Sequence, residues 1–320
     1  MKLSICIPTL NRPEYLIKAI ESIYKQDNNT FSFEVCISNN ASEVDYLEVK
    51  KKVFYLKNTF GNIKYYEHES RIPLDENMHF VKNMASGEYI YFLGDDDFFF
   101  SYAISEIELL CSQNVDLAIF NGDFVDKEGK FIGKHFSLPS QWFDNIEYAF
   151  VNLRDKGHFG AVLVKKKYLD DAYFTILYGS SHAYGCFWLH MLNNINEDYR
   201  IVIPSKACVN LRAAAKNYNE SKVYYTDIID EFLIYSENIN NDKGRALNSA
   251  FFEAYKKRVF SIKWMAAMFS RGARFSDVYQ KHEKYVVLFF CKKTVAFFLG
   301  NPLIYPYLKA CYKKIQLVLR

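Results

Sequence analysis

Between residues 3 and 122, short β-branched segments alternate with stretches of helical periodicity. The predicted strands cover 3–9, 33–39, 63–68, 88–94 and 115–122, and the predicted helices follow Pro13 and cover 43–57, 76–85 and 101–113. Strands that alternate with helices form βαβ units, which build a mostly parallel sheet covered by helices. In such a sheet, ligands bind beyond the carboxyl ends of the strands. We therefore expect the residues after the first, second and fourth strands to converge on one site.

Beyond residue 122 the pattern is looser. It predicts a hairpin over 125–133 with its turn at Glu128-Gly129, a strand over 160–166, and helices over 183–193, 222–238 and 246–269. The sequence therefore predicts an α/β domain over 1–210 and a helical region over 211–320.

The C-terminal region is strongly basic. From Lys256 to Arg320, fourteen Lys and Arg oppose only Asp277 and Glu283, so this segment carries +12 and the remainder −9 of the net +3. Such asymmetry suggests a surface for something anionic: a membrane, a polyanionic acceptor or a nucleic acid. The last of these is not expected, because no recognised nucleic-acid motif accompanies the charge.

From residue 285 onward, Phe, Tyr and Leu interleave with lysines, among them Lys292, Lys293, Lys313 and Lys314. This pattern suits an amphipathic element lying in the plane of an anionic inner leaflet. The alternative is an ordinary helical bundle with a solvated lysine face.

Cysteine usage and hydropathy indicate the compartment. The seven cysteines stand singly, with no C-x-x-C pair, as in a reducing environment. The first residues are predicted to be a strand and not a signal peptide, and Lys292 and Lys293 interrupt the apolar stretch 285–299. We expect a cytoplasmic protein, attached at most peripherally to the inner face of the cell membrane.

Three consecutive aspartates, Asp95, Asp96 and Asp97, follow the apolar segment YIYFLG. Like charges this close raise each other's pKa, and a divalent cation removes that cost. Mn²⁺ or Mg²⁺ binds carboxylate and phosphate oxygens, and neutralises charge that develops on a diphosphate leaving group. The alternative is that Asp97 caps a helix over 98–113.

Three motifs occur together here: PTLNR over 8–12, SNNAS over 38–42, and ASGEYI over 85–90 leading into the aspartates. In this combination the chain resembles the family 2 glycosyltransferases of the bacterial surface-polysaccharide type, closely over 1–125 and loosely over 126–210. The resemblance implies the Rossmann-like GT-A fold. It also implies inverting, metal-dependent transfer of a sugar from a nucleoside diphosphate to a hydroxyl of a glycan acceptor, as in O-antigen or capsule synthesis. Many such acceptors are carried on a polyprenyl diphosphate.

The resemblance also implies residue roles. Asp95 matches the first position of the D-x-D metal motif, Asp96 a ribose or metal-adjacent carboxylate, and Asp97 the principal metal ligand. The nucleotide pocket would be lined by Pro8, Thr9, Asn11, Arg12 and Asn39. The alternative for Arg12 is a solvated residue of the first helical turn; Asn77 and Asn83 would be donor contacts or surface amides.

Asn39 departs from the family pattern, because many relatives have an aspartate there that accepts the N3 hydrogen of uracil. An amide can both accept and donate a hydrogen bond. UDP or dTDP is therefore the favoured donor nucleotide, with CDP as the alternative.

Relatives usually carry a catalytic Glu-Asp pair at a helix start well after the metal motif, but no Asp or Glu lies between Asp171 and Glu197. His182 is the best substitute, since a neutral imidazole can act as a general base. Its alternative is a capping or packing histidine. Weaker candidates for the base are His158, His190, Asp144 and Asp198.

Two other functions remain open from the sequence. A nucleotidyltransferase would use similar metal and phosphate chemistry, but the N-terminal region lacks a glycine-rich, lysine-terminated phosphate loop. The missing acidic pair also suits a catalytically inactive relative that binds glycans or serves as a scaffold subunit.

Overall fold

The computed structural model describes residues 2–27, 31–213, 223–270, 286–301 and 305–306. The chain divides into two compact units, Met1–Lys216 and Asn217–Arg320. Strand β12 (Val209–Arg212) crosses the predicted boundary at residue 210, and it belongs to the first unit. The first unit is therefore longer than the sequence predicts.

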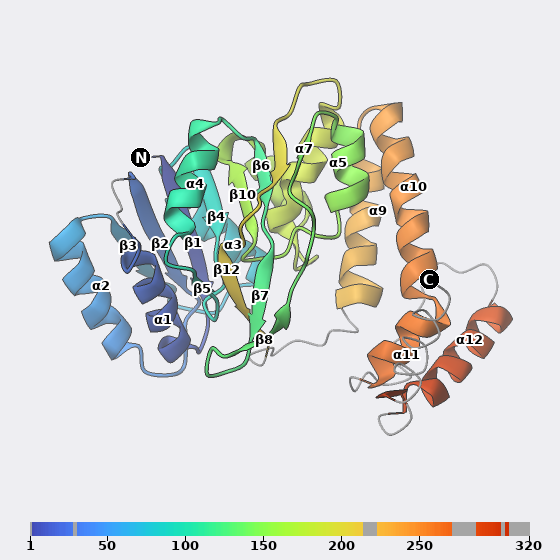
Figure 1. The fold of residues 1–320 in the computed structure, drawn as a ribbon, viewed down its shortest axis with the longest axis horizontal. Coiled ribbons are helices and arrows are strands. Elements are labelled where there is room, and N and C mark those ends of the chain that lie inside the picture. Colours follow the sequence, from blue (N-terminus) through green and yellow to red (C-terminus); the bar gives the residue numbers. More distant parts are fainter. Residues whose placement is uncertain (1, 28–30, 214–222, 271–285, 302–304, 307–320) are drawn as a thin grey trace. The chain divides into compact units, whose positions relative to one another are not determined.

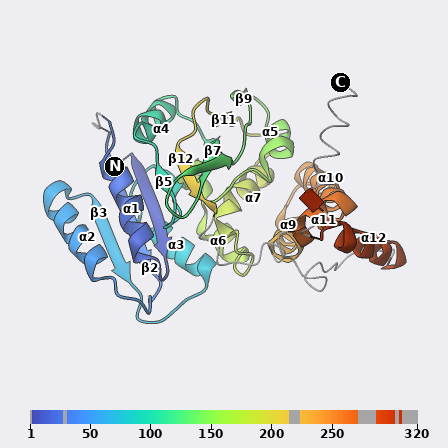
Figure 2. The same cartoon turned by 60° about the horizontal axis from the view of Figure 1, so that its bottom comes forward.

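Within the described residues, the main sheet of the first unit has eight strands in the order β3-β2-β1-β4-β10-β6-β11-β9 (Figure 1; β9 and β11 are labelled in Figure 2). Their bounds are β1 (Leu3–Thr9), β2 (Phe33–Asn39), β3 (Ile63–Glu67), β4 (Tyr89–Phe92), β6 (Leu117–Ile119), β9 (Gln141–Phe143), β10 (Val162–Lys165) and β11 (Ile201–Ile203). The four neighbouring strands β3, β2, β1 and β4 are parallel, whereas β10 runs antiparallel to both β4 and β6. The predicted mostly parallel sheet of an α/β fold is confirmed.

Helices of the first unit are α1 (Pro13–Tyr24), α2 (Leu47–Phe60), α3 (Leu74–Met84), α4 (Ala103–Ser112), α5 (Ile146–Leu153), α6 (Asp171–Ile176) and α7 (Cys186–Asn193). Pro13 begins α1 because its fixed φ angle suits the first helical position. Helix α1 buries Leu16, Ala19, Ile20 and Ile23, and α3 packs against β1 and β2. Both faces of β1 and β2 are covered, which explains why every residue in them is buried.

A second, smaller sheet has four strands among the described residues, in the order β5-β12-β7-β8 (Figure 1). It contains β5 (Phe98–Phe99), β7 (Gly122–Val125) and β8 (Phe131–Lys134) beside β12. Strands β7 and β8 form the predicted hairpin, with Gly129 at φ 92° in its turn. The predicted strand 115–122 is too long, because this segment contains β6 of the main sheet and the first residue of β7, which belongs to the second sheet.

The second unit is helical, as predicted. A π-helical turn (Val223–Asp227) leads into α9 (Ile228–Asn238), and α10 (Asp242–Val259), α11 (Ile262–Ser270) and α12 (Val286–Leu299) follow. Its core includes Phe232, Tyr255 and Met265. Among the residues placed by the structure, no helix has the length and apolar character needed to cross a membrane. Lys313 and Lys314 lie outside the described residues.

Candidate active site

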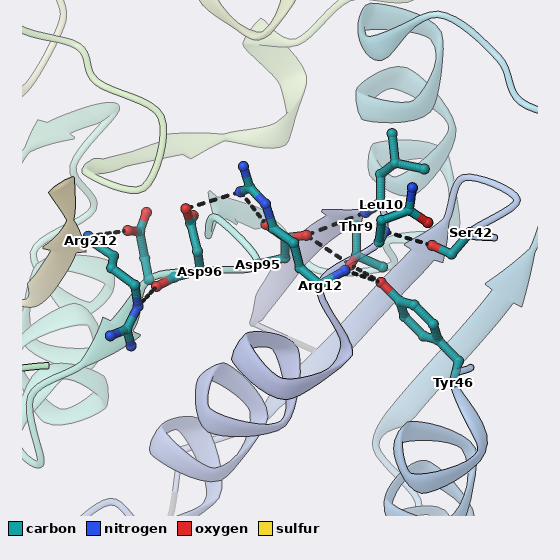
Figure 3. Close-up of polar contacts among 10 residues, drawn as sticks. Thr9, Leu10, Arg12, Ser42, Tyr46, Asp95, Asp96 and Arg212 are labelled. Carbon is teal, nitrogen blue, oxygen red and sulfur yellow. Dashed lines mark hydrogen bonds and ion pairs between the residues drawn. The ribbon is translucent and has the colours of Figure 1, made fainter. Parts of the chain in front are cut away.

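The aspartate triplet lies where strands β1 and β4 end. Asp95 Oδ2 accepts hydrogen bonds from Thr9 Oγ1 at 2.8 Å and from the backbone N–H of Leu10 at 3.3 Å (Figure 3). Thr9 is the last residue of β1 and Leu10 follows it, whereas Asp95 follows β4. These two strands pair in parallel. The predicted convergence of these two strand ends is confirmed.

Arg12 contacts two of the three aspartates. Its Nη1 lies 3.1 Å from Asp95 Oδ1 and 3.0 Å from Asp96 Oδ2, and only 21% of its side chain is exposed. The alternative of a solvated first-turn residue is therefore wrong. Arg12 therefore offsets part of the negative charge of the aspartate triplet.

Asp97 is held from another direction. Its Oδ1 accepts the backbone N–H of Arg212 at 3.0 Å. A Cβ atom at Gly94 or Gly160 would lie 2.5 or 2.7 Å from Asp97 Oδ2, so a side chain at either position would displace this carboxylate. Asp97 does not cap a helix, because α4 begins only at Ala103 with Tyr102 as its N-cap. The helix-cap alternative is thereby excluded.

All three carboxyl groups have raised pKa values. Burial raises the pKa of Asp95 to about 6; Arg12 opposes this shift and the charge of Asp96 adds to it. Burial, and next the charge of Asp96, raise the pKa of Asp97 well above its ordinary value. Burial raises that of Asp96 as well. The cluster is therefore short of positive charge, as its sequence predicts.

The donor set can be tested against a divalent cation. Among the described residues, no three His, Cys, Asp or Glu side chains converge to hold an ion by themselves. Mg²⁺ in enzymes is commonly held by one or two carboxylates together with substrate phosphates. The buried carboxyl oxygens of the triplet, with their raised pKa values, fit a site in which substrate phosphates supply the remaining ligands. The cluster thus suits an ion whose coordination the diphosphate completes.

Arg212 is a site residue that the sequence analysis missed. Its Nε donates to Asp96 O at 2.9 Å, and its Nη1 donates to Asp126 O at 3.0 Å and to Lys127 O at 2.6 Å. Figure 3 shows Asp96 between Arg212 and Arg12. The available signal was an arginine at the end of the short apolar segment VNLR, but that segment fell at the predicted domain boundary.

The loops after β1 and β2 are joined by hydrogen bonds. Ser42 Oγ accepts from the backbone N–H of Asn11 at 2.9 Å and donates to Asn39 Oδ1 at 2.6 Å. Asn39 also donates from Nδ2 to Tyr65 Oη at 3.0 Å, and it is fully buried. Pro8 lies inside β1, opposite Ser38 of β2. The structure thus brings these residues together, while their contact with a nucleotide stays a prediction.

The two asparagines of α3 differ. Asn77 is buried, and its Oδ1 accepts from Ser38 Oγ at 2.6 Å, so it is not a surface amide. Asn83 is exposed. Only Asn77 therefore lies against a strand that leads to the site.

His182 precedes the 3₁₀ turn Ala183–Gly185, which leads into α7, and it makes no side-chain cap. Its Nδ1 lies 2.8 Å from Ser180 O, and its backbone N–H donates to Ser180 Oγ at 3.0 Å. A carbonyl oxygen can only accept, so Nδ1 carries the proton of the neutral ring. Nε2 is then the nitrogen that can accept a proton.

The weaker candidates for the base separate by position. Asp144 follows β9 and Asp198 precedes β11, and strand directions place both at the amino edge of the sheet, opposite the aspartate triplet. Neither can reach the site, which corrects that expectation. His190 lies near the end of α7 against Tyr168, and burial lowers its pKa. His158 packs against His135, with ring centres 4.6 Å apart.

Residues 4–171 match the family model described as glycosyl transferase family 2. The chain is 28% identical over 282 residues to a GalNAc(5)-diNAcBac-PP-undecaprenol beta-1,3-glucosyltransferase of Campylobacter jejuni, covering 85% of this chain and 84% of that protein. It is 36% identical over 97 residues to the abequosyltransferase RfbV of Salmonella typhimurium, covering 30% of this chain and 28% of that protein.

Solved structures of Staphylococcus aureus TarS, residues 1–349, resemble the chain in fold. The TM-score is 0.60 for the protein alone and 0.61 for its complex with UDP-GlcNAc, each at 15% identity. Each match covers 97% of this chain and 92% of the TarS chain. The main sheet and its helices thus have the GT-A fold.

Proposed function

The chain belongs to glycosyl transferase family 2, and from this premise we propose that it transfers a sugar from a nucleoside diphosphate to a hydroxyl of a bacterial surface glycan. The observation that carries the proposal is the aspartate triplet. Its carboxyl groups have raised pKa values at the joined ends of β1 and β4, with Arg12 beside Asp95 and Asp96. A divalent cation would supply the positive charge that this cluster lacks, and the bound cation could in turn hold a diphosphate.

For the donor, we propose UDP or dTDP, with CDP as the rival, in a pocket lined by Pro8, Thr9, Asn11, Arg12 and Asn39. TarS, which has the same fold, was solved with UDP and with UDP-GlcNAc. The hydrogen bonds from Asn11 to Ser42 and from Ser42 to Asn39 support a preformed wall at this edge. Arg12 would turn from the aspartates toward the diphosphate.

For the metal, Mn²⁺ or Mg²⁺ would be held by Asp97 and Asp95, with Asp96 next to it. When bound, the ion neutralises the negative charge that develops on the departing diphosphate. Gly94 and Gly160 leave room around Asp97 Oδ2, and Arg212 fixes the backbone of Asp96. These residues keep the carboxylates in place before a ligand arrives.

We propose that His182 is the general base, and that transfer inverts the anomeric configuration. Nε2 of His182 would accept the proton of the acceptor hydroxyl as that oxygen attacks the anomeric carbon of the sugar, while the bond from that carbon to the diphosphate oxygen breaks and the nucleoside diphosphate leaves. The hydrogen bond from Nδ1 to Ser180 O supports this role, because it leaves Nε2 unprotonated. His182 also lies at the start of the segment that leads into α7, where related enzymes carry their acidic pair.

For the acceptor, the name of the Campylobacter relative specifies an undecaprenol diphosphate carrier, and we propose a lipid-linked glycan here too. We also propose that α12 binds peripherally to the inner face of the membrane, because this helix has exposed apolar side chains at Val295 and Phe297 and carries Lys292 and Lys293 one turn earlier. Sedimentation with anionic and neutral vesicles tests this part. Equal binding to both would contradict it.

The donor proposal is tested by thermal unfolding with UDP, dTDP and CDP, each with and without Mn²⁺. A ligand at 100 times its dissociation constant stabilises the protein by about 2.7 kcal/mol. We expect UDP or dTDP to raise the Tm most, and only with the cation. Asn39→Asp should then disfavour CDP, since a carboxylate has no donor for N3 of cytosine. No shift with any of the three would contradict the donor class.

A further inference from the structure

The segment that carries His182 is wrapped around one buried carboxylate of helix α3. Asp75 Oδ2 accepts the backbone N–H groups of Gly179 and Ser181, both at 2.9 Å, and Oδ1 accepts that of Ala183 at 3.1 Å. Asp75 is only 2% exposed. Three amides that are close in the chain thus share one charged acceptor.

Holding the segment this way has a conformational cost. Gly179 has φ 88° and Ser181 has φ 61°, and the left-handed region is unfavourable for a residue with a Cβ atom. Such a conformation persists only when surrounding contacts impose it. Hydrogen bonds to a charged acceptor are stronger than those between neutral groups. The carboxylate of Asp75 therefore supplies the contacts that keep this segment in place.

The same helix anchors the start of the segment. Tyr178 Oη lies 2.6 Å from Nδ1 of His79, whose Nε2 lies 2.8 Å from Asp171 Oδ1. The ring of His79 also stacks on Phe174, with centroids 4.8 Å apart. One face of α3 thus fixes the segment at Tyr178 and again at Ala183.

His182 takes its orientation from this segment. Its ring bonds to Ser180 O and its N–H to Ser180 Oγ, and Ser180 stands between the two amides that bind Asp75 Oδ2. The contacts of Asp75 therefore fix the backbone on both sides of the residue that orients the imidazole.

We propose that Asp75 is the positioning residue for His182, because it holds segment 178–183 in the conformation that aims the imidazole. This inference rests on the proposed role of His182 as the base. The proton acceptor then lies on the segment, and the residue that holds it in place lies on α3.

The test compares Asp75→Asn with Glu76→Gln, the next carboxyl group on the same helix. Asp75→Asn should lower kcat about 10- to 100-fold with the donor KM unchanged, whereas Glu76→Gln should leave both unchanged. Hydrogen exchange at the amides of Gly179, Ser181 and Ala183 should accelerate in Asp75→Asn only. Unchanged kcat in Asp75→Asn would overturn the proposal.

A double-mutant cycle with His182→Ala separates positioning from a general loss of structure. In the His182→Ala background, Asp75→Asn should cost less than about threefold in kcat, since its effect acts through the imidazole. The full loss in both backgrounds would overturn the proposal. His182→Ala at wild-type turnover would instead refute the proposed base. Wild-type kcat in Asp75→Asn, together with loss of activity in His182→Ala, would refute only the positioning role.

If Asp75→Asn does not fold, Gly179→Ala provides the same test. A Cβ at Gly179 would meet nothing within 4 Å, so that variant strains the backbone without a clash. It should lower kcat without changing the donor KM, and again only while His182 is present. An unchanged kcat in Gly179→Ala would contradict the proposal.

Discussion

Buried carboxyl groups at the two edges of the main sheet have pKa values shifted in opposite directions. At the amino edge, Glu34 accepts from Ser4 Oγ at 2.6 Å and from Ser86 Oγ at 2.7 Å, and lies 2.8 Å from Lys64 Nζ. Although burial acts to raise it, these bonds lower the pKa of Glu34 to about 2. At the carboxyl edge, burial and mutual repulsion hold the pKa of Asp95 and Asp97 above their ordinary values.

This difference in pKa separates carboxylates that stabilise the fold from carboxylates that are available to bind a ligand. A carboxylate whose bonds are complete stabilises the folded state in its charged form. A cluster short of positive charge destabilises the ligand-free protein, and the binding of a cation would remove the repulsion between its carboxylates. Buried charges at the two edges should therefore respond differently to removal, in stability and in activity.

The largest effect is expected from Asp97→Asn. Turnover should fall on the order of 10⁴-fold, since a catalytic metal contributes several kcal/mol to transition-state stabilisation. The Tm of the ligand-free protein should not fall, because the amide oxygen can still accept the N–H of Arg212 while one repelling charge is gone. Turnover assays and thermal unfolding measure both quantities.

Asp144→Asn is the matched control, because Asp144 is exposed at the opposite edge of the sheet. It should leave turnover and Tm unchanged. If Asp97→Asn loses stability along with activity, the aspartate triplet is part of the structural framework and the comparison fails.

A smaller effect, now on stability alone, is expected from Glu34→Gln. The variant should lose about 2–3 kcal/mol of unfolding free energy at pH 7, and its turnover should be unchanged. Because the pKa of Glu34 is lowered from 4.5 to about 2, its contribution is full above pH 4.5 and is lost as the pH falls toward 2. The wild type should therefore lose more stability than the variant over that interval in urea unfolding.

Glu48→Gln controls for loss of a surface ion pair. Glu48 and Lys51 pair with side chains 70% and 62% exposed, and such a pair contributes less than about 1 kcal/mol. Equal stability losses in the Glu34 and Glu48 variants would show that the buried bonds of Glu34 add nothing.

Local periodicity is enough to predict the strands and helices up to α4, except β5, and with them the convergence of the residues that follow β1 and β4. It could not predict β5 or β12, because strands this short depend on pairing with distant residues. Arg212 was missed for that reason. The positions of Asp144 and Asp198 could not be predicted, because the short strands β9 and β11 that they flank, and the antiparallel direction of β9, have no local signal.

The central claim is that the aspartate triplet serves metal-dependent transfer from a nucleotide sugar. The most direct measurement is turnover of a panel of UDP-, dTDP- and CDP-sugars by the wild-type chain, first with EDTA and then after Mn²⁺ is restored. We predict release of the nucleoside diphosphate from at least one donor, absent with EDTA and recovered with Mn²⁺. Turnover that is equal in EDTA and in Mn²⁺, or absent with every donor in both, would contradict this account.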